Sequence, residues 1–117
     1  MKIPEQGTLL RIFVGESDRA DSKPLYEAIV LRAREFQLAG ATVFRGILGF
    51  GRHSRIHTAK WEALSTDLPI VIEIVDAQEK IEAFLPIAEA MVAEGLMTLE
   101  KIRVIKYVSR PTPGTEP

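Results

Sequence analysis

The order in which strand-forming and helix-forming segments alternate constrains the fold of this chain more than any other feature. Four segments rich in strand-forming residues stand at 8–14, 41–48, 69–75 and 98–108. Two stretches, between Pro24 and Gly40 and between Asp76 and Gly95, repeat apolar residues every three or four positions, which is typical of amphipathic helices. The order is therefore βαββαβ. It predicts an α+β, ferredoxin-like fold, with two helices on one face of a four-stranded antiparallel sheet.

The length and composition favour one domain over residues 1–108, followed by a disordered tail over 109–117. The tail sequence SRPTPGTEP is rich in Pro, Gly and Thr. The net charge of −1 predicts no general attraction to nucleic acid, and no apolar run is long enough to span a bilayer. The absence of cysteine excludes disulfides and is compatible with a cytoplasmic location.

Several residues are candidates for the ends of the two helices. Gly40 is well placed to end the first helix, and Gly95 to end the second. Asp76 and Glu79 have the spacing of a capping box, which would start the second helix. Pro86 lies within the apolar stripe of that helix and is expected to kink or split it.

The face of the sheet away from the helices is the first candidate for function. Side chains alternate along a strand, so every second residue faces outwards. The expected outward set is Leu9, Arg11, Phe13, Val43, Arg45, Ile47, Val71, Glu73, Val75, Lys101, Arg103, Ile105 and Tyr107. This set mixes large apolar groups with charges. It fits a subunit interface with an Arg103–Glu73 ion pair, a solvated face or an anion-binding platform.

The long connection from Phe50 to Leu68 is the second candidate. Hairpin loops usually have two to five residues, so a longer connection in a small domain is functional or disordered. Its first part, GFGRHSRIHTAK, is basic and follows several glycines. Arg52 and Arg55 beside exposed backbone amides would suit a phosphate or carboxylate. The alternative is a bulged strand end followed by a solvated basic loop.

Sharper motifs in this segment do not predict specific chemistry. The run GFGRHS lacks the third glycine of a dinucleotide fingerprint and opens no helix. His53 and His57 could share a metal ion in a helical turn, but a zinc site needs a third ligand. No arrangement of acid, base and nucleophile is visible, so we expect no enzymatic activity.

Three segments together resemble a known family over Leu9 to Tyr107. The segments are GATVFRGILGFG with the basic loop containing His57, then LSTDLPIVIEIVD, and then EGLMTLEKIRVI. They look like the PII-like bacterial proteins of unknown function (domain of unknown function 190), which are related in fold to PII nitrogen regulators and CutA. The resemblance implies a regulatory homotrimer with inward-facing sheets, and ligand sites between subunits. It also implies that residues 50–66 form the arm that acts on a partner, such as a membrane transporter or channel.

The resemblance also implies which residues bind the ligand, which in PII proteins is an adenine nucleotide. The full set of predicted ligand-binding residues also includes Arg55 and His57 of the basic loop. It consists of Gly49, Gly51, Arg52, Arg55, His57, Glu94, Gly95, Leu96, Lys101 and Arg103. The turn AEGLMT has one glycine where PII proteins have several, which leaves a smaller anionic ligand as an alternative. A CutA-like protein that binds divalent metal through His53 and His57 is the competing function.

Overall fold

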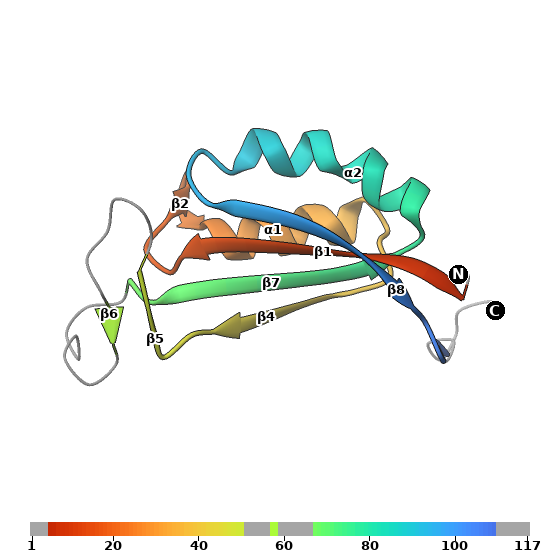
Figure 1. Ribbon diagram of the computed structural model, residues 1–117. Helices are drawn as coiled ribbons and strands as arrows, with labels where there is room; N and C mark the ends of the chain where they lie inside the picture. The colour runs from red at the N-terminus through yellow and green to blue at the C-terminus, as the bar shows by residue number, and fades with distance from the viewer. Residues whose placement is uncertain (1–4, 51–56, 59–66, 110–117) are drawn as a thin grey trace.

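The structure of this chain, a computed structural model, describes residues 5–50, 57–58 and 67–109 (Figure 1). Its strands are β1 (Gln6–Gly15), β2 (Arg19–Ala20), β3 (Lys23–Pro24), β4 (Ala41–Arg45), β5 (Leu48–Gly49), β6 (His57–Thr58), β7 (Pro69–Asp76) and β8 (Leu96–Arg103). Its helices are α1 (Leu25–Glu35) and α2 (Gln78–Met91). The predicted tail from residue 110 onwards lies outside the described residues.

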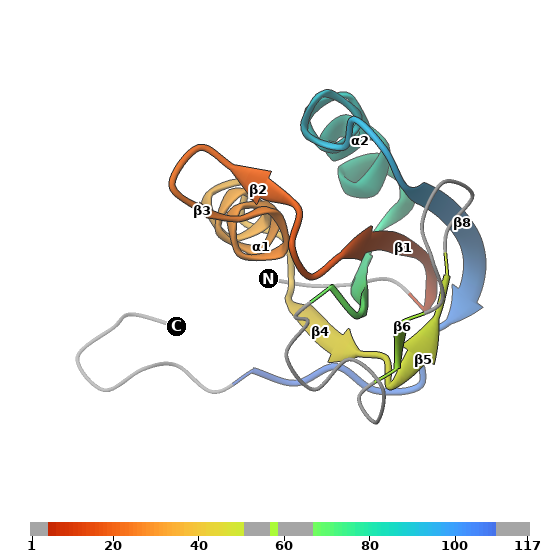
Figure 2. The same ribbon diagram turned by 90° about the vertical axis from the view of Figure 1, so that its left-hand side faces the viewer.

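Four strands form one antiparallel sheet in the order β4-β7-β1-β8. Both helices lie on the same side of this sheet, as the end-on view shows (Figure 2). The predicted ferredoxin-like α+β fold is therefore confirmed. Two short ladders accompany the sheet: β2 pairs with β3 before α1, and β5 pairs with β6 beyond the end of β4.

The core lies between the sheet and the two helices. The sheet buries the alternate residues Leu10, Ile12, Val14, Ile70, Ile72 and Ile74. The helices bury Leu25, Ile29, Ala33, Ile81, Phe84 and Ala88 against them. The rings of Phe36 and Phe84 meet with centroids 5.5 Å apart, which ties the end of α1 to the middle of α2. Burying each large apolar side chain stabilises the fold by about 1.5–3 kcal/mol.

The strand register defines which residues lie on the side of the sheet away from the helices, here called the open face. Residues directly opposite each other on paired strands share a face. The open face consists of Leu9, Arg11, Phe13, Thr42, Phe44, Val71, Glu73, Val75, Leu96, Thr98, Glu100 and Ile102. The predictions for β1 and β7 are thus correct.

The predictions for the two outer strands are wrong by one residue. Val43 is opposite Ile72 and Arg45 is opposite Ile70, so both belong to the helix side of the sheet. Lys101 and Arg103 are likewise opposite Thr8 and Gln6, on the parity of the helix side. A shift of one residue moves every side chain of a strand to the other face.

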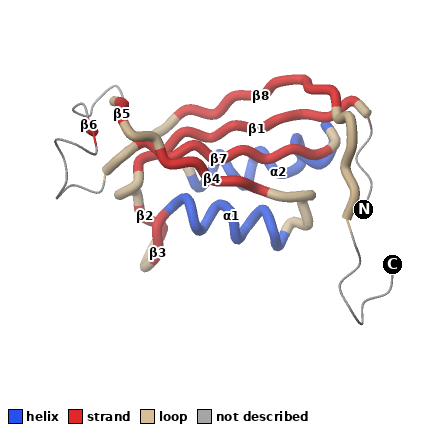
Figure 3. Tube along the Cα trace, turned by 90° about the horizontal axis from the view of Figure 1, so that it is seen from below, coloured by secondary structure: helices blue, strands red, loops and turns tan. Residues whose placement is uncertain are grey.

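The last strand is shorter at its end than predicted. It ends at Arg103, which is paired with Gln6, the first residue of β1. Residues 104–109, here called the strap, follow β8 and do not form a strand. Ile105 and Tyr107 therefore lie on the strap rather than in the sheet. The strap crosses the end of the sheet, from the β8 side towards the β4 side (Figure 3).

The ends of the helices also differ from the predictions. α1 ends at Glu35, and the left-handed residue beyond it is Gln37, with a φ of 64°, rather than Gly40. α2 has Ala77 at its N-cap with no side-chain capping bond, so the predicted capping box is absent. Pro86 lies inside α2, which continues through it to Met91 and is not split.

Candidate functional site

A hairpin at one end of the sheet forms the base of the long connection. The chain leaves β4 through Gly46, and β5 then pairs with β6. Leu48 is opposite Thr58 and Gly49 is opposite His57. The two predicted site residues Gly49 and His57 are therefore neighbours on paired strands. Gly51, Arg52 and Arg55, like His53, lie outside the described residues.

The glycines of this hairpin are explained by their packing against Pro69. The amide of Gly46 donates a 2.7 Å hydrogen bond to the carbonyl oxygen of Pro69. A Cβ atom at Gly46 would lie 2.7 Å from Pro69 Cγ, and one at Gly49 would lie 2.9 Å from the same atom. Only glycine allows this close approach. These two glycines therefore place the hairpin against β7, a role that the sequence alone did not reveal.

The turn between α2 and β8 lies at the same end of the sheet. It contains Glu94 and Gly95, and Leu96 directly after it begins β8; all three are predicted site residues. Gly95 has a φ of 158°, and a Cβ atom there would overlap the carbonyl oxygen of Phe13. Phe13 is two residues before Gly15, which is paired with Pro69. This end of the sheet, here called the hairpin end, thus unites five predicted site residues: Gly49, His57, Glu94, Gly95 and Leu96.

Arg45, expected on the open face, lies at the hairpin end instead. Its Nη2 atom is 3.0 Å from Oε1 of Glu16, which follows β1. The amide of Glu16 in turn donates a 2.8 Å hydrogen bond to the carbonyl oxygen of Leu68. This pair of charges links the end of β4 to the connection that leads from β1 towards α1.

Lys101 and Arg103 lie towards the opposite end of β8. The Nε atom of Arg103 is 2.8 Å from Oε1 of Glu5, so the predicted Arg103–Glu73 ion pair is wrong. Glu73 is paired with Arg11 on the neighbouring strand, at 2.9 Å. Arg11 also lies 3.7 Å from Glu100 across the open face. Arg11 therefore forms ion pairs with two carboxylates on the open face.

The far end of the sheet carries a groove of about 620 Å³, which lies between the strap and the open face. Its lining is mostly apolar and includes Thr42, Val75, Ile102, Ile105 and Tyr107. We call this the strap end. A groove of this volume is within the range of small-molecule sites. Sequence reasoning missed the groove because it treated residues 104–108 as part of a strand.

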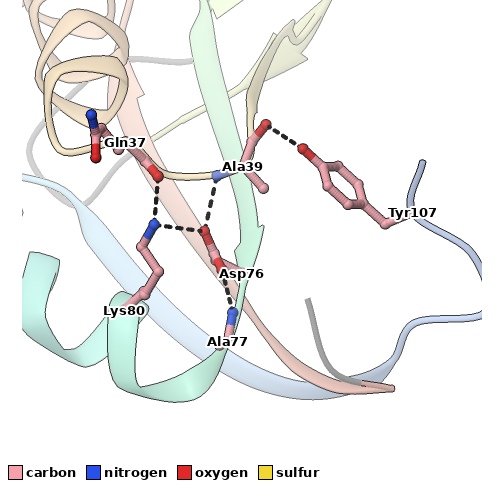
Figure 4. A network of polar contacts seen from close by, with 6 residues as sticks. All are labelled: Gln37, Ala39, Asp76, Ala77, Lys80 and Tyr107. Atoms are coloured by element: carbon pink, nitrogen blue, oxygen red, sulfur yellow. Dashed lines mark hydrogen bonds and ion pairs between the residues drawn. The ribbon is translucent and has the colours of Figure 1, made fainter. Parts of the chain in front are cut away.

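A buried carboxylate network supports the strap end (Figure 4). Asp76 is fully buried and accepts hydrogen bonds from the amides of Ala39, at 2.9 Å, and Ala77, at 2.6 Å. Lys80 donates to the carbonyl oxygen of Gln37. The hydroxyl of Tyr107 lies 3.4 Å from the carbonyl oxygen of Ala39 and forms the outermost contact. The network thus joins α2 and the start of β4 to the strap.

The part of the chain that the structure describes holds no group of three or more His, Asp or Glu side chains arranged to bind a metal ion. The helices among those residues are also too short or too polar to cross a membrane.

Sequence comparison identifies related proteins over most of the chain. The model of the family DUF190, described as "Uncharacterized ACR", matches residues 7–104. A UPF0166 protein of Aquifex aeolicus is 44% identical over 97 residues, which cover 83% of this chain and 91% of that protein. A UPF0166 protein of Methanocaldococcus jannaschii is 32% identical over 101 residues, with 84% and 91% covered.

Comparison with solved structures identifies CPII, a nitrogen regulatory PII-like protein from Thiomonas intermedia K12. Its complex with ADP, AMP and bicarbonate superposes with a TM-score of 0.60 at 19% identity, over 86% of this chain and 90% of that one. Its complex with ADP and bicarbonate gives a TM-score of 0.58 at 18% identity, with the same coverage. The fold described above is thus shared with a PII-like protein.

Proposed function

Because this chain belongs to the DUF190 family and has a PII-like fold, we propose that it is a trimeric regulatory protein that binds a small anionic ligand between its subunits. The family membership agrees with the resemblance read from the sequence. In this proposal the ligand is an adenine nucleotide, and residues 50–66 act on a partner protein. The role is regulatory, without catalysis, and belongs to the cytoplasm.

The proposal rests on one observation, the mixture of exposed apolar side chains and paired charges on the open face. Phe44 and Leu96 on this face are exposed, and Phe13 and Val71 are only partly buried. Among these apolar side chains lies Arg11, between Glu73 and Glu100. A contiguous apolar surface of this kind is typical of a protein interface. Copies of the same chain, with their sheets facing inwards, would cover it.

The ligand class is supported by the hairpin end and by the likeness in fold. CPII, which shares the fold, is described as bound to ADP, AMP and bicarbonate. In this chain the hairpin end carries Gly49 and His57, and the basic segment with Arg52 and Arg55 continues directly from it. Arginine guanidinium groups form strong, charge-assisted hydrogen bonds to phosphates and carboxylates.

The partner is proposed to be a membrane transporter or channel, which residues 50–66 would contact. Coupling between ligand and partner requires that the ligand bind one arrangement of this segment more tightly than another. A ligand with equal affinity for both arrangements would not change the contact with the partner.

Calorimetric titration of the purified protein tests the ligand class. We expect ATP, ADP, AMP, a cyclic adenine nucleotide or bicarbonate to bind. Replacing Arg52 by alanine should weaken that binding at least about tenfold, since a charge-assisted hydrogen bond contributes about 1.5–3 kcal/mol. The matched control is Arg32→Ala on α1, where the arginine pairs with Glu35 and should leave binding unchanged.

Two outcomes of this titration would contradict the proposal. If none of these compounds produced heat at any protein concentration, the adenine nucleotide and bicarbonate ligands would be excluded. If Arg52→Ala and Arg32→Ala weakened binding equally, the basic segment would not be the binding site.

A further inference from the structure

The strap is fixed firmly where it leaves β8 and only loosely at its other side. The amide of Val104 donates a hydrogen bond to the carbonyl oxygen of Glu5, directly after the last pair of the β1–β8 ladder. The hydroxyl of Tyr107 lies 3.4 Å from the carbonyl oxygen of Ala39. The usual oxygen–oxygen distance of such a hydrogen bond is about 2.7–2.8 Å, so this second anchor is weak.

The packing of the strap adds little to these two anchors. Ile105 is 80% exposed and Val108 is 73% exposed, so neither side chain is buried against the sheet. The groove lies between the strap and the open face, and along it the two surfaces do not pack directly against each other. A segment with few buried apolar contacts opens at a small cost in free energy. The strap can therefore leave the sheet without unfolding the rest of the domain.

Ala39, the residue that Tyr107 contacts, is held from the interior of the protein (Figure 4). Its amide donates a 2.9 Å hydrogen bond to Oδ2 of Asp76, whose side chain is fully buried. Oδ1 of the same carboxylate accepts a 2.6 Å hydrogen bond from the amide of Ala77. A buried carboxylate needs such partners, because losing one leaves a polar group without compensation. Asp76 therefore fixes the position of the Ala39 backbone.

Lys80 provides a second contact between α2 and the same connection. Its Nζ atom donates to the carbonyl oxygen of Gln37 and lies 3.9 Å from Oδ2 of Asp76. Gln37 has a φ of 64°, in the left-handed region that residues other than glycine rarely adopt. The start of α2 thus holds the α1–β4 connection at two points, Gln37 and Ala39. The first of these points is a residue whose backbone needs support.

We propose that the strap is a latch, and that Asp76 sets its closed position through the backbone of Ala39. The amide of Ala39 bonds to Asp76 and its carbonyl oxygen to Tyr107, so one residue links the interior to the strap. The closed strap forms one wall of the groove, and its release would uncover Val75 and Ile102 at the end of the open face.

The latch would connect the start of α2 to a groove that α2 does not line. Neither Asp76 nor Lys80 is among the residues of the groove. A movement of the first turn of α2 would nevertheless change the balance between the closed and the released strap, because Ala39 would move with it. All of these contacts lie within one chain. The latch therefore goes beyond the proposed function and does not depend on the trimer.

Fluorine NMR of the protein labelled with fluorotyrosine tests the latch. The chain has two tyrosines, Tyr107 on the strap and Tyr26 on α1, so the second serves as an internal reference. Asp76→Asn removes the charge and one of the two acceptor oxygens. The Tyr107 resonance should move towards the position of the unfolded chain, while the Tyr26 resonance stays in place. Glu79→Gln, an exposed control in the same turn of α2, should move neither resonance.

Cleavage by trypsin after Lys106 provides a second measurement, with the fragment that begins at Tyr107 quantified by mass spectrometry. Cleavage reports the population of the released strap when opening is fast. Tyr107→Phe should accelerate it about two- to tenfold, the range expected for loss of one neutral hydrogen bond. Asp76→Asn should accelerate it at least about tenfold, because a buried amide also loses its acceptor. Lys80→Met, at a partly exposed position, should have a smaller effect in the same direction.

Three results would overturn the latch. The first is a folded Asp76→Asn protein, verified by circular dichroism, whose Tyr107 resonance is unchanged or whose Tyr26 resonance moves equally. The second is a Tyr107→Phe protein that trypsin cleaves after Lys106 no faster than the wild type. If Asp76→Asn does not fold, Lys80→Met decides. Cleavage at the wild-type rate in that variant, or equal acceleration by Glu79→Gln, is the third result.

Discussion

Single glycines have different roles in this molecule, and their surroundings distinguish those roles. Gly95 closes the α2–β8 turn against β1, where a side chain would overlap the carbonyl oxygen of Phe13. Gly40, between α1 and β4, has nothing within 4 Å of the place that a Cβ atom would occupy. The sequence predicted the same helix-ending role for both. Of these two glycines, only Gly95 stands where a side chain would clash with its surroundings.

We therefore expect opposite results when each of these two glycines is replaced by alanine. Gly95→Ala should lower the free energy of unfolding by about 1–3 kcal/mol, because the backbone must shift away from Phe13 or remain strained. Gly40→Ala should be neutral or stabilise the fold slightly, since alanine restricts the unfolded chain. Urea denaturation followed by circular dichroism measures both values. Equal effects of the two substitutions would disprove the steric explanation.

At the scale of the element, the sequence predicted the strands better than their register. β7 alternates throughout between buried and half-buried residues, and β1 does so from Leu10 onwards, so their faces follow from the pattern. β4 offers Ala41, Val43 and Arg45 on one side against Thr42 and Phe44 on the other. Each set mixes apolar with polar groups, so hydrophobicity does not select a face. β8 is ambiguous for the same reason.

The end of β8 could not be predicted from its own residues. Val104 to Val108 remain strong strand formers, but a strand needs a partner to bond with. The partner, β1, begins at Gln6, which is paired with Arg103. The ladder therefore stops where β1 begins, and the strap and its groove follow from that limit. The glycines of the hairpin, by contrast, were visible in the sequence, although their contact with Pro69 was not.

Helix α2 contains a proline that the fold tolerates at a cost. Pro86 is exposed in the interior of the helix, so it cannot donate the backbone hydrogen bond of a regular turn. Pro86→Ala should raise the free energy of unfolding by about 1–3 kcal/mol. The exposed control Glu89→Ala on the same helix should change it by less than about 0.5 kcal/mol. A destabilised Pro86→Ala protein, measured by urea denaturation, would show that the proline has a structural role.

At the scale of the whole molecule, the two faces of the sheet differ in what covers them. The helices bury the middle of one face, including Ile12 of β1 and Ile72 of β7, which share the core cluster with Phe84 of α2. The open face keeps exposed apolar groups and an arginine between two carboxylates. The sequence predicted this asymmetry correctly, although it placed the residues of β4 and β8 on the wrong sides. The parity of β1 and β7 was sufficient for it.

If the open face is the interface between copies, a charge at Phe44 should disrupt assembly. Phe44 is exposed on the open face of β4, whereas Leu31 is exposed on α1, on the other side of the molecule. Phe44→Glu should therefore shift the trimer towards monomer, and Leu31→Glu should not. Analytical ultracentrifugation at several concentrations measures the difference. A Phe44→Glu protein with an unchanged sedimentation coefficient would place the interface elsewhere.

Arg11 lies between Glu73 and Glu100 on the open face, and this arrangement of charges should make association between copies depend on salt. On the strands of the open face, the described charges are Arg11, Glu73 and Glu100, so each copy contributes one surplus negative charge. In the proposed trimer, three copies facing a common axis would bring these surplus charges together, and their repulsion would oppose association. Dissolved ions screen that repulsion over about 10 Å at 0.1 M. Raising the ionic strength should therefore strengthen association in the proposed trimer, which is the reverse of what salt does to assemblies held by surface ion pairs.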